Sequence, residues 1–131
     1  MRALIVEDDF VSRIVLQKMI SAFGSCETAV NGREAVEAFS MAHNEDNPYN
    51  LICLDIMMPE MDGIEALRII REKETEMKIH PSEEAKIVMI TALDTPKDVI
   101  EAFYKGGCTA YLVKPIEKEK VVNTLKEIKV V

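Results

Sequence analysis

Acidic, hydroxyl and basic residues stand directly after short apolar runs of this sequence. Glu7 and Asp8 follow the apolar run 3–6, and Asp55 follows the run 51–54. Thr91 follows the run 87–90, and Lys114 follows the run 110–113. If these side chains converge, the three carboxylates repel one another unless a cation neutralises them. Mg²⁺ prefers oxygen ligands of this kind, so the pattern predicts a magnesium site.

A carboxylate beside a metal ion, a lysine and a hydroxyl group is also a site that can accept a phosphoryl group. The carboxylate attacks phosphorus, the metal and Lys114 neutralise the equatorial oxygens, and the hydroxyl group of Thr91 donates a hydrogen bond to one of them. We expect Asp55 to be the nucleophile, because it ends the most uniformly apolar run, which favours a central strand. Glu7 and Asp8 are adjacent and suit a metal-binding pair.

Short apolar runs alternate with amphipathic stretches along the whole chain. The expected strands cover residues 3–6, 26–30, 51–54, 87–90 and 110–113, and the expected helices follow them at about 11–23, from Asn31, from Asp62, from Thr95 to Gly106, and through 121–128. Strict alternation favours a parallel sheet, because parallel neighbours need crossover connections. We therefore predict an α/β, flavodoxin-like (βα)5 fold, a doubly wound five-stranded parallel sheet flanked by five helices. Sites in such sheets form at the carboxyl ends of the strands.

The composition is typical of one folded domain. The chain has 131 residues, of which 48% are apolar and 30% charged, so we expect a single domain over residues 1–131 and no effector domain. The net charge of −7 disfavours direct binding to nucleic acid or to an anionic membrane. No apolar run is long enough for a bilayer span and the first residues turn acidic too early for a secretory signal, which favours a cytoplasmic protein. The cysteines, Cys26, Cys53 and Cys108, lack CxxC spacing and are interpreted as reduced packing residues.

The residues at the strand ends resemble those of response regulator receiver domains of two-component signalling, in particular the single-domain chemotaxis type. The matching segments are IVEDD at the first strand, LDIMMPEMDG around Asp55, MITA at Thr91, and YLVKP at Lys114 and Pro115. Each segment is a weak signal alone. In this order, each on a strand end, they are highly specific, and the resemblance extends over the whole chain.

The resemblance implies a role for each residue of the acidic group. Asp55 would be the phosphorylated aspartate, Asp8 a direct ligand of Mg²⁺ (or Mn²⁺), and Glu7 a residue that acts through a metal-bound water. The backbone carbonyl of Met57 would be a further ligand, and Lys114 would pair with the phosphoryl group.

Three more positions take their roles from the resemblance. Pro115 would follow a cis peptide bond, and Ala92 would be the small residue that gives a phosphoryl group access to the site. Tyr111 would be a rotamer switch, although a core aromatic with its hydroxyl group near solvent is the alternative. Asp9 is the spare acid of the first loop, and we interpret it as a helix N-cap or first-turn charge.

The implied function is a phosphorylation-activated signalling switch that catalyses its own phosphorylation and dephosphorylation and is not a conventional enzyme. A histidine kinase or histidine phosphotransfer domain would supply the phosphoryl group. Phosphorylation would draw Thr91 and Lys114 inward and make room for Tyr111. The face formed by the fourth helix, the fifth strand and the fifth helix would then bind a downstream target protein. The phosphorylated form could be a monomer or a dimer.

Two other functions are alternatives to a signalling switch. A Mg²⁺-dependent phosphohydrolase would also form an aspartyl phosphate, but enzymes resembling the haloacid dehalogenase family carry a second acid two residues after the nucleophile, where this chain has Met57. An interaction module that is never phosphorylated would not need the intact acidic group. Met57 and Leu93 are apolar where a polar side chain could orient water, which predicts a phosphoaspartate of moderate to long lifetime.

Overall fold

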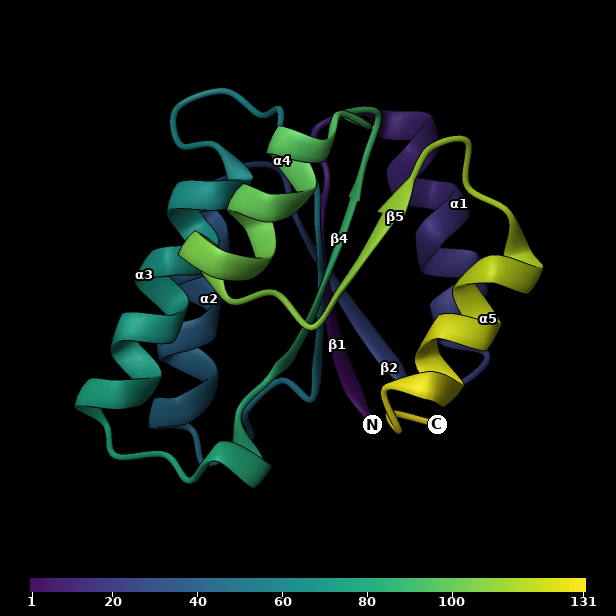
Figure 1. Ribbon diagram of the computed structural model, residues 1–131. Coiled ribbons are helices and arrows are strands. Elements are labelled where there is room, and N and C mark those ends of the chain that lie inside the picture. The colour runs from purple at the N-terminus through teal and green to yellow at the C-terminus, as the bar shows by residue number, and fades with distance from the viewer.

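The computed structural model describes residues 1–131 and contains one parallel sheet between two layers of helices (Figure 1). The strands are β1 (Arg2–Val6), β2 (Ser25–Ala29), β3 (Leu51–Leu54), β4 (Lys86–Thr91) and β5 (Ala110–Val113). Their order in the sheet is β2-β1-β3-β4-β5. This is the flavodoxin-like order, so the predicted fold is confirmed.

Each face of the sheet is covered by its own set of helices. The helices are α1 (Phe10–Ser21), α2 (Gly32–Asn44), α3 (Gly63–Glu76), α4 (Pro96–Ile100) and α5 (Lys118–Glu127), with a short 3₁₀ turn, η1, at Pro81–Glu83. In Figure 1, α1 and α5 lie on one side of the sheet, and α2, α3 and α4 lie on the other. None of these helices combines the length and apolar character that a membrane span requires.

The strand β3 shows why the central apolar runs are continuous. All four of its residues are buried, and successive side chains alternate between the two cores. Ile52 and Leu54 pack in the core that contains Phe39 of α2, whereas Leu51 and Cys53 pack in the core that contains Leu16 of α1 and Leu125 of α5. A strand covered on both faces gains about 1.5–3 kcal/mol from each large apolar side chain that it buries.

Polar side chains begin four of the helices at the predicted positions. The N-caps are Asp9, Asn31, Asp62 and Thr95, which accept hydrogen bonds from the backbone N–H groups of Ser12, Glu34, Glu65 and Asp98 respectively. These bonds satisfy donors that a helix leaves free at its first turn. The N-cap role predicted for Asp9 is confirmed, so Glu7 and Asp8 are left as the acidic pair between β1 and α1.

The fourth helix differs from its prediction. It is α-helical only over Pro96–Ile100 and continues as a π-helix, η2, over Glu101–Gly106. The helix ends at Gly107, which has a left-handed φ of 78°, and the carbonyl of Ala102 accepts hydrogen bonds from the N–H groups of both Gly107 and Cys108. A wide turn that adds one residue does not disturb apolar spacing enough to be visible in the sequence. The edge strand β2 also begins and ends one residue earlier than predicted.

Two of the thiol groups, those of Cys53 and Cys108, are buried and so protected from reagents in solution. Burial raises the pKa of the Cys53 thiol to about 12 and that of Cys108 to about 11. Because the thiolate is the reactive form, we predict that iodoacetamide at pH 8 labels only the half-buried Cys26 in the native protein. Peptide mass spectrometry should find all three residues labelled after denaturation. Labelling of Cys53 in the native protein at the rate of a small free thiol would contradict this packing.

Candidate functional site

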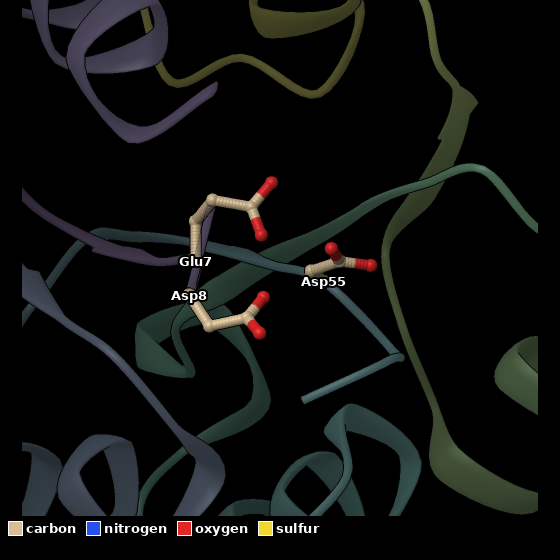
Figure 2. Close-up of side chains that lie close together, drawn as sticks. All are labelled: Glu7, Asp8 and Asp55. Atoms are coloured by element: carbon tan, nitrogen blue, oxygen red, sulfur yellow. The ribbon is translucent and has the colours of Figure 1, made fainter. Parts of the chain in front are cut away.

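The carboxyl ends of β1 and β3 bring three carboxylates together. Glu7, Asp8 and Asp55 each offer one carboxylate oxygen, and these oxygens lie within 4.8 Å of one another. In Figure 2 the side chains of Glu7 and Asp8 extend toward Asp55. β1 and β3 are neighbours in the sheet, with Val6 paired to Leu54, so the residues that follow these two positions must be adjacent. The predicted convergence of the acids is therefore present in the structure.

The burial of these acids differs, and this bears on which ion fits between them. Glu7 and Asp55 are only 1% and 7% exposed, whereas Asp8 is exposed. A divalent cation among the three oxygens would be shielded from solvent on the side of the buried residues and open to solvent on the side of the exposed Asp8. Mg²⁺ is bound in proteins through one or two carboxylates and keeps several waters. The donor set, with oxygen atoms and no imidazole or thiolate, fits this ion.

Lys114 brings a positive charge to the same place from the end of β5. Its Nζ forms an ion pair with Glu7 and another with Oδ2 of Asp55 at 3.1 Å. The backbone N–H of Lys114 donates to the carbonyl of Thr91 at 2.8 Å, which aligns the ends of β4 and β5. Thr91 is fully buried, and its Oγ1 lies 3.4 Å from the backbone nitrogen of Leu93, which donates to it. All the strand-end residues singled out in the sequence thus meet at one edge of the sheet.

Burial and repulsion perturb the titration of this group. Burial, and after it the neighbouring carboxylate of Asp55, raise the pKa of Glu7 to about 7, although Lys114 acts to lower it. Burial alone would lower the pKa of Lys114, but its hydrogen bonds to Glu7 and Asp55 outweigh this and raise it. The lysine therefore remains charged, while Glu7 is poised to bind or release a proton near neutral pH.

Backbone contacts hold Asp55 and the loop that follows it. The N–H of Asp55 donates to the carbonyl of Val6 at 3.1 Å, and the N–H of Gly63 donates to the carbonyl of Ile56 at 2.8 Å. The loop between β3 and α3 therefore folds back on its own start. A Cβ atom at position 63 would clash with the carbonyl oxygen of Asp55, so only glycine permits this approach. The side chain of Met57, two residues after Asp55, is 62% exposed.

One residue that supports the acidic pair was not singled out in the sequence. Arg13, in the first turns of α1, donates from Nη1 to the backbone carbonyl of Glu7 at 2.9 Å. The N–H of Glu7 donates to the carbonyl of Ala29 at the end of β2 at 3.0 Å. Both bonds fix the backbone from which the Glu7 carboxylate extends. The pattern of charges in α1 carries no signal that would distinguish Arg13 from a solvated basic residue.

The remaining candidate residues surround the group on the side of β4 and β5. Ala92, directly after Thr91, is exposed. Tyr111 is half-buried, and its hydroxyl group donates to the carbonyl of Leu93 at 2.7 Å. The peptide bond between Lys114 and Pro115 is cis.

Comparisons with known proteins agree on one family. The model of the response regulator receiver domain matches residues 3–126. The chain is 38% identical to the chemotaxis protein CheY of Thermotoga maritima over 129 residues, which cover 97% of this chain and 96% of that protein.

Solved structures with the same fold include two complexes that contain BeF₃ and Mg²⁺. CheY of Borrelia burgdorferi, in a complex with CheX, BeF₃ and Mg²⁺, is 28% identical with a TM-score of 0.83, covering 100% of this chain and 90% of that one. The receiver domain of the histidine kinase CKI1 of Arabidopsis thaliana, complexed with Mg²⁺ and BeF₃⁻, is 26% identical with a TM-score of 0.80, covering 99% of this chain and 90% of that one.

The raised pKa of Glu7 predicts a pH dependence of stability in the metal-free protein. An acid whose pKa is higher in the folded than in the unfolded state makes the folded protein less stable as it ionises. The contribution of Glu7 to the free energy of unfolding should therefore fall as pH rises from about 4.5 to 7. Relative to wild type, Glu7→Gln should gain on the order of 3 kcal/mol between pH 4 and pH 8, given a pKa of about 7.

Urea unfolding of both proteins in EDTA across this pH range measures the effect. The difference between wild type and Glu7→Gln isolates this one carboxyl group, because all other titrating groups are common to both proteins. A difference in unfolding free energy that stays constant from pH 4 to pH 8 would contradict the assigned environment of Glu7.

Proposed function

This chain belongs to the response regulator receiver family, and we propose on that basis that it is a phosphorylation-activated signalling switch in which Asp55 accepts the phosphoryl group. The observation that carries the proposal is the position of the Asp55 carboxylate, 3.1 Å from Lys114 Nζ and within 4.8 Å of the carboxylate oxygens of Glu7 and Asp8. An anionic nucleophile beside a fixed cation and a cation-binding pair suits attack on an anionic phosphoryl group.

The proposed residues divide the work of phosphoryl transfer. An oxygen of Asp55 forms the new bond to phosphorus while the bond from phosphorus to the donor imidazole nitrogen breaks. Lys114, already held by two carboxylates, moves its charge to the equatorial oxygens, and the hydroxyl group of Thr91 donates to another of them. Ala92 keeps the approach free of a bulky side chain.

The proposed metal is Mg²⁺. When bound, it supplies positive charge that offsets the carboxylates and the transferring group. Asp8 and Asp55 would bind it directly, Glu7 through water, and Met57 through its backbone carbonyl. The presence of Mg²⁺ beside BeF₃ in the similar proteins from Borrelia burgdorferi and Arabidopsis thaliana supports this assignment.

The proposed partners are a histidine kinase or histidine phosphotransfer domain as donor and a target protein on the face formed by α4, η2, β5 and α5. That face carries exposed apolar side chains, namely those of Ile100, Phe103, Tyr104 and Val113. Tyr111 lies beside them, with its hydroxyl group bonded to the loop after β4. Movement of Thr91 toward a phosphoryl group would change the space open to Tyr111 and so the shape of this face.

Beryllofluoride with Mg²⁺ tests whether Asp55 is the acceptor. Addition of BeF₃⁻ and Mg²⁺ to wild-type protein should shift the NMR amide signals of residues around Asp55, Thr91 and Lys114, and acetyl phosphate with Mg²⁺ should add the mass of one phosphoryl group. Asp55→Ala removes the oxygen nucleophile and should abolish both effects. An unresponsive wild type, or an equal response of Asp55→Ala, would rule out the phosphoacceptor function.

The environment of the acceptor predicts a slow loss of the phosphoryl group. Met57 and Leu93 offer no polar side chain to orient an attacking water, so the phosphoaspartate should persist for minutes or longer. Met57→Asn should shorten its lifetime by on the order of tenfold, because an amide can hold a water near phosphorus. Loss of acid-labile phosphate after removal of the donor measures this, and a wild-type half-life of seconds would count against the interpretation.

A further inference from the structure

Glu60, in the loop between β3 and α3, has a strained backbone. Its φ is 68°, in the left-handed region, although it is neither glycine nor asparagine. Such a conformation costs a side-chain-bearing residue on the order of 1 kcal/mol and persists only where surrounding contacts compensate for it. The contacts that hold Glu60 therefore show what the loop is built to maintain.

The carboxylate of Glu60 binds the start of α2. Its Oε2 accepts a hydrogen bond from Nδ2 of Asn31 at 3.0 Å and lies 3.4 Å from Nε of Arg33. Asn31 is 7% exposed, and its Oδ1 accepts from the N–H of Glu34 at 2.9 Å as the N-cap of α2. One buried amide group thus joins the helix terminus to the loop, using both its donor and its acceptor.

A backbone contact reinforces this junction one residue further along. The N–H of Gly32 donates to the carbonyl of Met61 at 3.2 Å. A Cβ atom at position 32 would lie 2.6 Å from that carbonyl oxygen, so glycine is required for the approach. The loop is therefore held against α2 at Glu60 and Met61. Its two ends are held by the bond from Asp55 to β1 and by the bond from Gly63 to Ile56.

We propose that Glu60 is a positioning residue that, through its bonds to the start of α2, fixes the backbone at Met57 and with it the place of the Met57 carbonyl group. Glu60 lies three residues after Met57, separated from it only by Met58 and Pro59, so rotation at position 60 moves the carbonyl. This inference rests on the proposed function, in which that carbonyl is a Mg²⁺ ligand. It adds that the interface between α2 and the loop determines how well the ligand set is formed before the metal binds.

The test compares Mg²⁺ binding with the order of the loop in the metal-free protein. Glu60→Ala should weaken Mg²⁺ binding about tenfold, the effect typical of removing a residue that orients a metal ligand. It should also speed amide hydrogen exchange at Gly32 and Gly63 in EDTA. Isothermal titration calorimetry and NMR measure the two quantities. Glu60→Gln keeps an acceptor for Asn31 but loses the charge toward Arg33, and should weaken binding less than Glu60→Ala does.

A swap of the two interacting groups gives a sharper outcome. Asn31→Asp should impair Mg²⁺ binding because two carboxylates would face each other, whereas the double variant N31D/E60Q restores one donor and one acceptor and keeps the helix cap. It should bind Mg²⁺ within about threefold of wild type. The matched control is Glu37→Gln, which removes the other, exposed partner of Arg33 and should change neither quantity.

The outcomes separate this inference from the function on which it rests. Wild-type protein that fails to bind Mg²⁺ overturns both. If wild-type protein binds Mg²⁺ and both Glu60→Ala and Glu60→Gln bind it as tightly as wild type does, only the positioning role is overturned. The same follows if the double variant binds no better than Asn31→Asp while remaining folded by circular dichroism.

Discussion

Repulsion among three carboxylates at one edge of the sheet is the interaction around which this molecule is arranged. Glu7 and Asp55 are almost completely buried, and Lys114 supplies a single positive charge against them and Asp8. Burial of Glu7 and the nearby carboxylate of Asp55 raise the pKa of Glu7 to about 7, because both make its ionised form unfavourable without a metal ion. The arrangement that lowers stability without a cation is the one that favours binding of a divalent cation and then of a phosphoryl group.

The sheet order creates this concentration of charge, and the loops maintain it. β1 and β3 are neighbours in the sheet, so the residues after Val6 and Leu54 cannot avoid one another. Arg13 and the carbonyl of Ala29 hold the first loop through the backbone of Glu7, while Gly63 and the pairing of Glu60 with Asn31 hold the second. The helices of the two faces thus contribute to the site by holding the loops after β1 and β3, through bonds to both side-chain and backbone atoms.

The parts of the fold that depend on local chemistry were predictable from the sequence. Continuous apolar runs such as 51–54 indicate strands buried on both faces, and Asp9, Asn31, Asp62 and Thr95 are N-caps because their side chains bond to amides only three residues away. The convergence of Glu7, Asp55 and Lys114 follows from strand ends that share one edge. Contacts between segments distant in sequence leave no such signal: the sequence predicts Asn31 as a helix cap, but nothing in it indicates the hydrogen bond that Asn31 donates to Glu60. The π-helical turn after Ile100 also leaves no distinct spacing.

Chemical identification of the modified residue tests the central claim most directly. After brief treatment with acetyl phosphate and Mg²⁺, sodium borohydride reduces an aspartyl phosphate to homoserine, and peptide mass spectrometry locates the change. Our account predicts homoserine at position 55 and at no other acid of the chain, with no product when Mg²⁺ is replaced by EDTA. Homoserine at Asp8 or at a surface aspartate, with Asp55 unchanged, would contradict it.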